Sequence, residues 1–129
     1  MSEPIWLRIE AILALHDESI SEHGGAPGIR DLGLLESALA RPQNRFAYEN
    51  VDVAALAAAY AFGIVRNHPF TDGNKRAGFL AAIVFLEING LHFNATEEDA
   101  TLTFLSLAAG DLEEDALAQW LRANSRTAE

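Results

Sequence analysis

The sequence predicts an all-α fold, and three observations support this prediction. No stretch of useful length alternates apolar and polar residues as a half-buried strand does. Apolar residues instead recur at helical spacing between capping residues and glycines. Two segments, residues 53–66 and 77–88, are apolar on nearly every face, which places them at the centre of a bundle. We therefore expect a compact helical bundle that forms a single domain over residues 1–129.

Proline and glycine mark the bounds of the first two expected helices. Pro4 suits the first turn of the first helix, and Gly24 with Gly25 ends it. After a loop, Asp31 can accept hydrogen bonds from the first turn of a second, short helix that runs through Ala40.

Pro42 is expected to stop this second helix, because a proline ring clashes with the preceding helical turn. Residues 43–50 are polar and aromatic without a clear period, so we expect a loop there that serves as a flap over the site. Asp52 then caps the central helix over residues 53–66.

The last third of the chain is expected to be extended or irregular over residues 91–95 and then helical twice. Thr96, with Asp99 three residues on, resembles a capping box that opens one helix. Asp111, with Glu114 three residues on, is expected to open the last helix in the same way.

Composition excludes several classes of function. The chain has no cysteine, so it has neither a disulfide framework nor a thiolate metal site. No apolar run reaches the length that spans a membrane. The formal net charge of −10 argues against direct binding of nucleic acid, which needs clustered Lys and Arg. We expect a cytoplasmic protein.

The residues that carry chemistry fall within nine consecutive positions, His68-Pro69-Phe70-Thr71-Asp72-Gly73-Asn74-Lys75-Arg76. They precede the second apolar segment, which we expect to form a central helix that closes at Gly90. The unpaired amides and the dipole of its first turn form an anion site. Lys75 and Arg76 add two positive charges, and Lys75 is the single lysine beside eight arginines. We expect a phosphate to bind here.

Each motif residue has a chemical and a purely structural interpretation. His68 can accept the proton of an attacking hydroxyl, or it can cap or pack the turn. Asp72 can hold Mg²⁺ shared with a nucleotide, or it can cap the helix. Asn74 can donate to a phosphate oxygen, or it can cap as well. Arg76 can hold a phosphate through its guanidinium fork, or it can form a surface ion pair.

The remaining candidates are weaker. Gly73 lets a phosphate approach the backbone, or it is a turn glycine. Arg66 can reach the same anion or oppose the dipole of its own helix. His16 and His23 lie seven residues apart, too far to clamp one metal ion without further ligands, so we expect packing or exposure for both. Phe79 is expected to belong to the core.

The nine-residue motif resembles the signature of the Fic/Doc superfamily, His-x-Phe-x-(Asp/Glu)-(Gly/Ala)-Asn-(Gly/Lys)-Arg, and its lysine resembles the death-on-curing (Doc) branch. The likeness extends to Leu15-His16-Asp17, Gly24-Gly25, Gly28-Ile29-Arg30-Asp31, Leu35-Glu36-Ser37-Ala38 and Arg41-Pro42-Gln43. The resemblance implies a Fic-like helical bundle with a central motif helix. It also implies a catalytic set of His68, Asp72, Lys75 and Arg76, nucleotide-binding residues Gly73, Asn74, Lys75, Arg76 and Arg66, and Mg²⁺ on Asp72.

Most members of the superfamily transfer AMP from ATP to a protein hydroxyl, with Gly at the eighth motif position and Arg three residues after the motif. Lys75 and Phe79 stand at those places here. Both match the death-on-curing branch, in which the nucleotide binds reversed and the γ-phosphate of ATP goes to a threonine of elongation factor Tu, arresting translation. The resemblance thus implies the toxin of a toxin–antitoxin system.

Self-inhibiting members carry a helix motif (Ser/Thr)-x-x-x-Glu-(Gly/Asn), and this string does not occur here. We therefore expect a separate cognate antitoxin that lies over the cleft. Two alternatives stay open at this point: a protein adenylyltransferase, and a non-catalytic protein that mainly binds its antitoxin.

Overall fold

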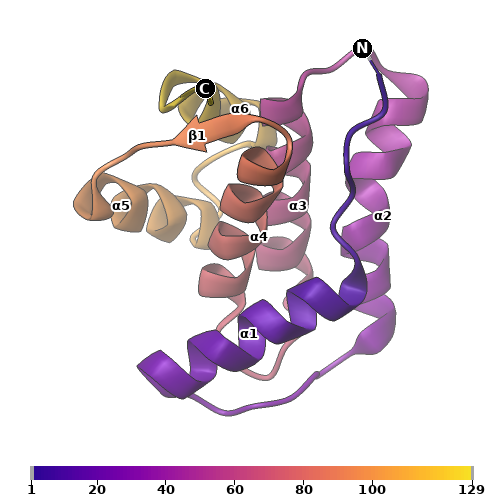
Figure 1. Ribbon diagram of the computed structural model, residues 1–129. Coiled ribbons are helices and arrows are strands. Elements are labelled where there is room, and N and C mark those ends of the chain that lie inside the picture. Colours follow the sequence, from indigo (N-terminus) through magenta and orange to yellow (C-terminus); the bar gives the residue numbers. More distant parts are fainter. Residues whose placement is uncertain (1, 129) are drawn as a thin grey trace.

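A computed structural model describes residues 2–128, and within that range the protein is built from six helices and one small sheet (Figure 1). This confirms the all-α prediction. The elements are α1 (Ile9–His23), α2 (Leu32–Tyr48), α3 (Val53–Asn67), α4 (Asn74–Ile88), β1 (Leu91–Phe93), α5 (Glu97–Ala108), α6 (Glu114–Ala123) and β2 (Ser125–Thr127).

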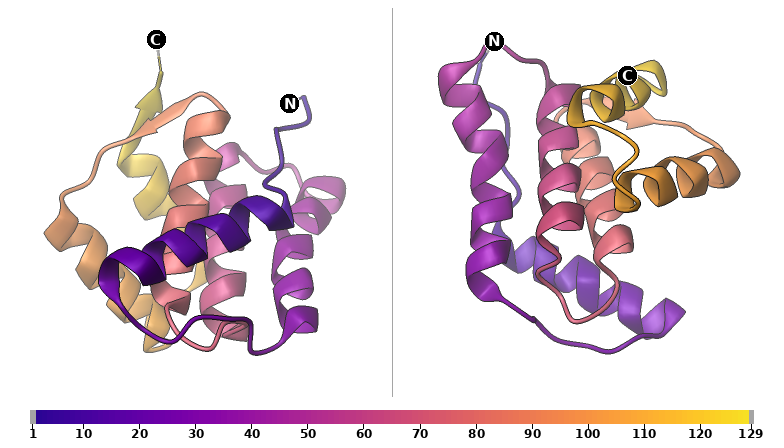
Figure 2. Two further views of the ribbon diagram at one scale, coloured as in Figure 1. Left: turned by 60° about the horizontal axis from the view of Figure 1, so that its bottom comes forward. Right: turned by 180° about the vertical axis from the view of Figure 1, so that it is seen from behind.

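Helices α3 and α4 lie at the centre, as their apolar composition predicts. Helices α2 and α6 pack against α3, and α1 crosses the end of α4 that carries the motif (Figures 1 and 2). Small residues allow close packing of the central pair. A Cβ added to Gly78 would lie 2.8 Å from Val65 Cγ2 and 3.2 Å from the carbonyl oxygen of Ala61. The turn that joins α3 to α4 therefore connects two closely packed helices, which fix the positions of its ends.

The prediction that the first helix starts near Pro4 is wrong, because α1 begins only at Ile9. Tertiary contacts hold the preceding segment extended. The backbone N–H and C=O of Ile5 both bond to the side chain of Asn89, at 2.7 and 2.9 Å. The N–H of Leu7 donates to the hydroxyl of Tyr60 at 3.0 Å. These groups are no longer available for a helical turn.

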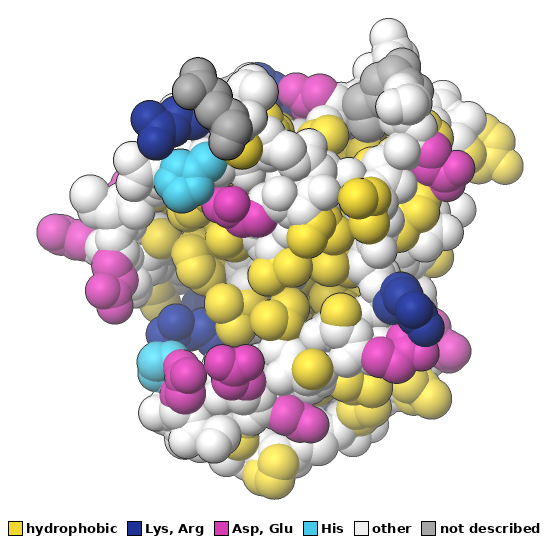
Figure 3. Space-filling model, in the orientation of Figure 1, with side chains coloured by type: hydrophobic (Ala, Val, Ile, Leu, Met, Phe, Trp, Pro, Cys, Tyr) yellow, Lys and Arg dark blue, Asp and Glu magenta, His cyan; other side chains and the backbone are white. Residues whose placement is uncertain are grey.

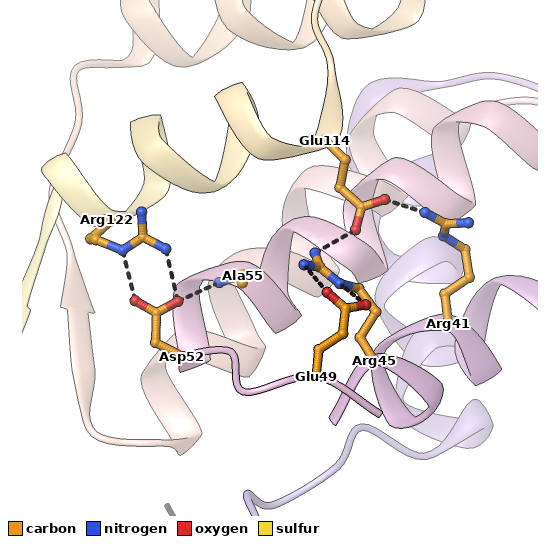
Figure 4. A network of polar contacts seen from close by, with 7 residues as sticks. All are labelled: Arg41, Arg45, Glu49, Asp52, Ala55, Glu114 and Arg122. Atoms are coloured by element: carbon orange, nitrogen blue, oxygen red, sulfur yellow. Dashed lines mark hydrogen bonds and ion pairs between the residues drawn. The ribbon is translucent and has the colours of Figure 1, made fainter. Parts of the chain in front are cut away.

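The second helix does not stop before Pro42, so the predicted end at Ala40 is wrong. Helix α2 continues to Tyr48 with Pro42 buried inside it. Contacts on both sides of the proline hold the helix together (Figure 4). Arg41 and Arg45 both pair with Glu114 of α6, and Arg45 lies 2.8 Å from Glu114 Oε2. Packing and ion pairs outweigh the hydrogen bond that proline removes.

Residues 43–50 are consequently not a flap over the site, which corrects that prediction as well. The end of α2 leads into the first residue of α3, whereas the motif follows the last residue of α3. Fifteen residues of helix, about 22 Å, separate these two ends of α3 (Figure 1).

The C-terminal third follows the predictions with two exceptions. Thr96 caps α5 by accepting from the N–H of Asp99 at 3.1 Å. Asp99 does not return the bond, because its carboxylate accepts from Trp120 Nε1 at 2.9 Å. Helix α6 starts after Glu113 without a side-chain cap, so the predicted cap at Asp111 is wrong. Residues 91–93 are extended as predicted, and they pair antiparallel with β2.

No helix in the described part of the chain combines the length and the hydrophobicity that crossing a membrane requires.

Candidate active site

The motif residues form the turn between the two central helices and the first turn of α4. His68 ends α3, Gly73 precedes α4, and the helix itself starts at Asn74. Gly73 has a φ of 77°, a left-handed conformation that favours glycine. No side chain caps the first backbone amides of α4, so they remain available to a ligand beside the motif turn.

His68 has an unusual backbone and an exposed side chain. Its φ and ψ are 54° and 53°, and it is the only non-glycine residue with a positive φ among residues 2–128. A side chain in this region of conformational space costs about 1–2 kcal/mol. Exposure argues against packing, because the imidazole is open to solvent or to a ligand. The backbone of His68 does occupy the C-cap position of α3, which fits the capping alternative.

Asn74 is buried and holds the turn in shape. Its Oδ1 accepts from the N–H of Phe70 at 2.8 Å, and its Nδ2 donates to the carbonyl oxygen of Phe70 at 2.9 Å. Only 4% of Asn74 is exposed. The structure thus favours a positioning role for this side chain over direct contact with a phosphate. As in the capping alternative, the side chain bonds to the backbone of the chain itself.

His16 supports the turn from below, a role that the sequence did not reveal. Its ring stacks on Phe70 with centroids 3.8 Å apart and planes 8° apart. Its Nε2 lies 2.7 Å from the carbonyl oxygen of Asp72, and because a carbonyl only accepts, Nε2 donates. His16 is 1% exposed and His23 is exposed, so the prediction of packing or exposure is confirmed.

Asp72 is exposed, and each oxygen of its carboxylate accepts one backbone hydrogen bond. Oδ1 accepts from Gly73 at 2.9 Å, and Oδ2 accepts from Ala26 at 3.2 Å. The carboxylate does not cap α4, whose N-cap residue is Gly73 and has no side-chain cap. Each oxygen keeps a lone pair, which suits Mg²⁺, since that ion binds through one or two carboxylates plus phosphates and water.

Lys75 and Arg76 lie side by side in the first turn of α4 and are both exposed. Together with Phe79 they line a pocket of about 510 Å³ between α4, β1 and α5. Phe93 and Phe104 also line this pocket. Figure 3 shows basic side chains beside a band of hydrophobic side chains on this face of the molecule. The pocket thus combines a cationic edge with an aromatic interior.

Phe79 belongs to both the pocket wall and an aromatic cluster. Its ring meets Phe104 at 5.2 Å and Phe93 at 6.0 Å, both edge to face. The expectation that Phe79 packs is confirmed, and the pocket shows in addition that it is half-buried at the site.

Arg66 does not line the pocket beside Lys75 and Arg76. Its guanidinium lies 4.8 Å from the ring centre of Phe62, and that of Arg41 lies 5.3 Å from the same ring. The pocket lined by Lys75 and Arg76 does not include Arg66. Its position in the last turn of α3 fits the dipole alternative.

The segment between α1 and α2, residues 24–31, covers the motif turn, which the sequence did not predict. Ile29 forms an antiparallel bridge with Phe70. Thr71 donates to the carbonyl oxygen of Gly28 at 3.1 Å, and Arg30 donates to that of Pro69 at 2.7 Å. The signal in the sequence was the cluster of glycines at 24, 25 and 28, all with positive φ.

Gly25 shows why this cluster matters. A Cβ there would lie 2.8 Å from Asp72 Oδ2, so only glycine lets the segment approach the carboxylate.

Comparison with known proteins shows the family of the chain. Residues 6–86 match the Fic/DOC family. The chain is 39% identical over 114 residues to the protein kinase doc of Escherichia phage P1, covering 88% of this chain and 90% of the phage protein. It is 43% identical over 76 residues to the toxin Doc of Mycolicibacterium smegmatis, covering 56% of this chain and 57% of that protein. With the motif turn, its glycine-rich cover and these similarities together, the chain belongs to the Fic/DOC family and to its death-on-curing branch.

Proposed function

We propose that this protein is the toxin of a toxin–antitoxin system and acts as a phosphotransferase on a protein hydroxyl. The observation that carries the proposal is the arrangement of the motif: an exposed imidazole precedes a helix N-terminus that bears two adjacent cations at the edge of a pocket. Its similarity to a protein named as a kinase supports the reaction type. Its similarity to a protein named as a toxin supports the biological role.

In the proposed reaction, a threonine hydroxyl attacks the γ-phosphorus of ATP. A bond forms between that oxygen and the phosphorus, the bond from the phosphorus to the β–γ bridging oxygen breaks, and ADP leaves. The hydroxyl proton goes to the imidazole of His68, which is exposed at the start of the motif turn. Proximity of this base to the bound phosphate is the contribution we assign to the turn.

Charge at the N-terminus of α4 would stabilise the group that is transferred. The first amides of the helix carry partial positive charge, and the adjacent Lys75 and Arg76 both line one pocket. Asp72 is the residue that would hold Mg²⁺, and the ion when bound would neutralise charge on the phosphates. Gly73 leaves room for a phosphate near the backbone. Asn74 would act by holding the turn.

Two residues favour γ-phosphate transfer over AMP transfer. Lys75 fills space that a glycine would leave open for a diphosphate. Phe79 stands in the pocket wall, in contact with other aromatic rings, and supplies no cation for a γ-phosphate in the adenylylating orientation. Adenylyl transfer is therefore the second candidate.

We propose a threonine of elongation factor Tu as the target and a cognate antitoxin as the partner that covers the cleft. The pocket beside Lys75 and the hydrophobic band next to it (Figure 3) support a partner that buries apolar side chains there. A partner held in this place would block access to the motif turn.

The assignment is tested with ATP labelled separately at the α and γ positions, incubated with purified elongation factor Tu. We expect γ label on the factor, no α label, and neither label with the His68→Ala variant. Label from the α position alone would replace the proposal with adenylyl transfer. Absence of both labels, on the factor and on every protein of a bacterial lysate, would favour the non-catalytic alternative.

The toxin role is tested by expressing the chain alone in a susceptible bacterium. We expect growth arrest with the wild-type chain and normal growth with His68→Ala at equal protein levels. Normal growth with both chains would contradict the toxin role.

A further inference from the structure

The carbonyl groups at the end of α3 have an unusual partner in Arg30. Its Nε donates to the carbonyl oxygen of His68 at 2.7 Å, and its Nη2 donates to that of Asn67 at 3.0 Å. A planar guanidinium that spans two consecutive carbonyls fixes the orientation of both peptide groups. These carbonyls flank the one non-glycine residue with a positive φ in the described part of the chain.

Arg30 is itself held firmly against the turn. Its N–H and that of Asp31 both donate to the carbonyl oxygen of Pro69, at 2.7 and 2.9 Å. Asp31 in turn caps α2 by accepting from the N–H of Leu34 at 3.0 Å. The side chain of Arg30 therefore starts from a fixed backbone position rather than from a free loop.

Asn67, the residue before His68, is also tied to the segment that contains Arg30 and the start of α2. Asn67 Nδ2 donates to the carbonyl oxygen of Leu34 at 2.9 Å, so the start of α2 and the end of α3 share hydrogen bonds. His68 thus sits between two residues whose carbonyls are tied to the covering segment. Its left-handed backbone decides the direction of its Cα–Cβ bond, and hence where the imidazole can lie.

We propose that Arg30 is a positioning residue that holds His68 in its left-handed conformation and so aims the imidazole at the attacking hydroxyl. The proposal rests on the proposed function, in which His68 is the base. In this proposal Arg30 acts through the two carbonyls, with which its Nε and Nη2 are engaged. A small displacement of a catalytic group costs much rate, so the effect should appear in kcat.

The first test compares Arg30→Met, Arg30→Lys and the control Arg8→Met. Arg8 is exposed and lies 3.9 Å from Glu10, far along the chain from the motif. We expect Arg30→Met to lower kcat by about 10- to 100-fold with the KM for ATP changed less than about twofold. Arg30→Lys should retain part of kcat, because an ammonium can reach one carbonyl but cannot span both. Arg8→Met should behave as wild type.

An increase in KM for ATP at unchanged kcat would overturn the proposal and make Arg30 a nucleotide ligand. Unchanged kcat and KM would leave it a plain structural contact, which also contradicts the proposal. Should Arg30→Met fail to fold, the changes in kcat and in the KM for ATP are measured in Arg30→Lys instead.

A second readout does not need activity. The His68 resonances of nucleotide-free protein, assigned with a His68→Gln variant, are followed by NMR in wild type, Arg30→Lys and Arg8→Met. We expect backbone and imidazole shifts at His68 in Arg30→Lys, with none at His92. If wild type proves inactive as a phosphotransferase, this arm still decides: unshifted His68 signals refute the positioning role, and shifted signals support it.

Discussion

At the residue scale, the motif turn gathers its chemistry by placing single side chains in demanding conformations. His68 adopts a left-handed backbone, and Asn74 gives both ends of its amide to Phe70. His16 stacks beneath Phe70 and donates to Asp72. Most of these contacts use backbone atoms of the turn, so the geometry depends on conformation more than on side-chain pairing.

The backbone of His68 predicts a separation of stability from activity. Both His68→Ala and His68→Gly remove the proposed base and should lower turnover by about 10²–10⁴-fold. Gly accepts a positive φ without strain, so His68→Gly should be more stable than His68→Ala by about 1 kcal/mol. Urea unfolding with parallel turnover assays measures both quantities. A glycine variant less stable than the alanine variant would contradict the strain argument.

Lys75 predicts a change in the type of transfer. Lys75→Gly removes one charge-assisted contact, so phosphotransfer should fall by about ten- to a hundredfold. The vacated space should admit a diphosphate, and a low level of AMP transfer is expected. Labelling with α- and γ-labelled ATP measures the two activities, and full phosphotransfer by Lys75→Gly would remove the lysine from the catalytic set.

Phe79→Arg in the same background supplies the missing cation and should raise AMP transfer. It also replaces a ring that packs on Phe104 and Phe93, so a loss of stability is expected. The melting temperature is therefore measured beside activity.

At the scale of elements, side-chain ion pairs join helix α2 to α6. Glu114 is 14% exposed in its side chain and accepts from both Arg41 and Arg45 (Figure 4). The pKa of Arg45 is raised, chiefly by its hydrogen bond to Glu49. The hydrogen bond to Glu114 and the negative charges of Glu114 and Glu49 add to this effect, whereas burial lowers the pKa. These contacts lie on either side of Pro42.

Glu114→Gln should therefore destabilise the protein, since it leaves two arginines without their shared charge. We expect a loss of about 1–3 kcal/mol in the free energy of unfolding, with the end of α2 loosened beyond Pro42. Glu113→Gln changes a neighbouring exposed glutamate and serves as the control. Urea unfolding and hydrogen exchange of residues 43–48 measure the two effects, and equal losses in both variants would contradict the tether.

At the scale of the whole molecule, an ion pair joins the start of α3 to the end of α6. Asp52 accepts from Arg122 at 2.7 and 2.8 Å and also caps α3 through Ala55 at 3.0 Å (Figure 4). The hydrogen bond from Arg122 holds the pKa of Asp52 below its usual 3.8, with burial acting in the opposite direction.

This lowered pKa predicts the direction of an acid effect. The folded protein binds a proton at Asp52 less readily than the unfolded chain does, so the pair stabilises the fold above about pH 4. The contribution is lost as the pH falls through the folded pKa. Half the side chain is exposed, which limits the effect to about 1 kcal/mol or less. Unfolding measured from about pH 6 downward should show a smaller acid loss in Asp52→Asn, and parallel curves would contradict the assignment.

The sequence by itself determined the helices whose signals are local. Asp52 and Thr96 cap α3 and α5 where the pattern predicted, because an N-cap hydrogen bond spans only three residues. The apolar segments of α3 and α4 could lie only at the centre. The motif, too, could be located, since its nine residues are consecutive and the dipole of the helix they open follows from its direction.

Only the tertiary structure decided the features that depend on contacts between distant residues. Helix α2 passes through Pro42 because Glu114, far along the chain, pairs with the arginines around it. The segment before Ile9 is extended because Asn89 takes its backbone groups. Arg30 contacts His68, which lies 38 positions further along the chain. His16 contacts Asp72, which lies 56 positions further along. Such contacts carry no periodic signal in the sequence, because their energy is realised only when the helices pack.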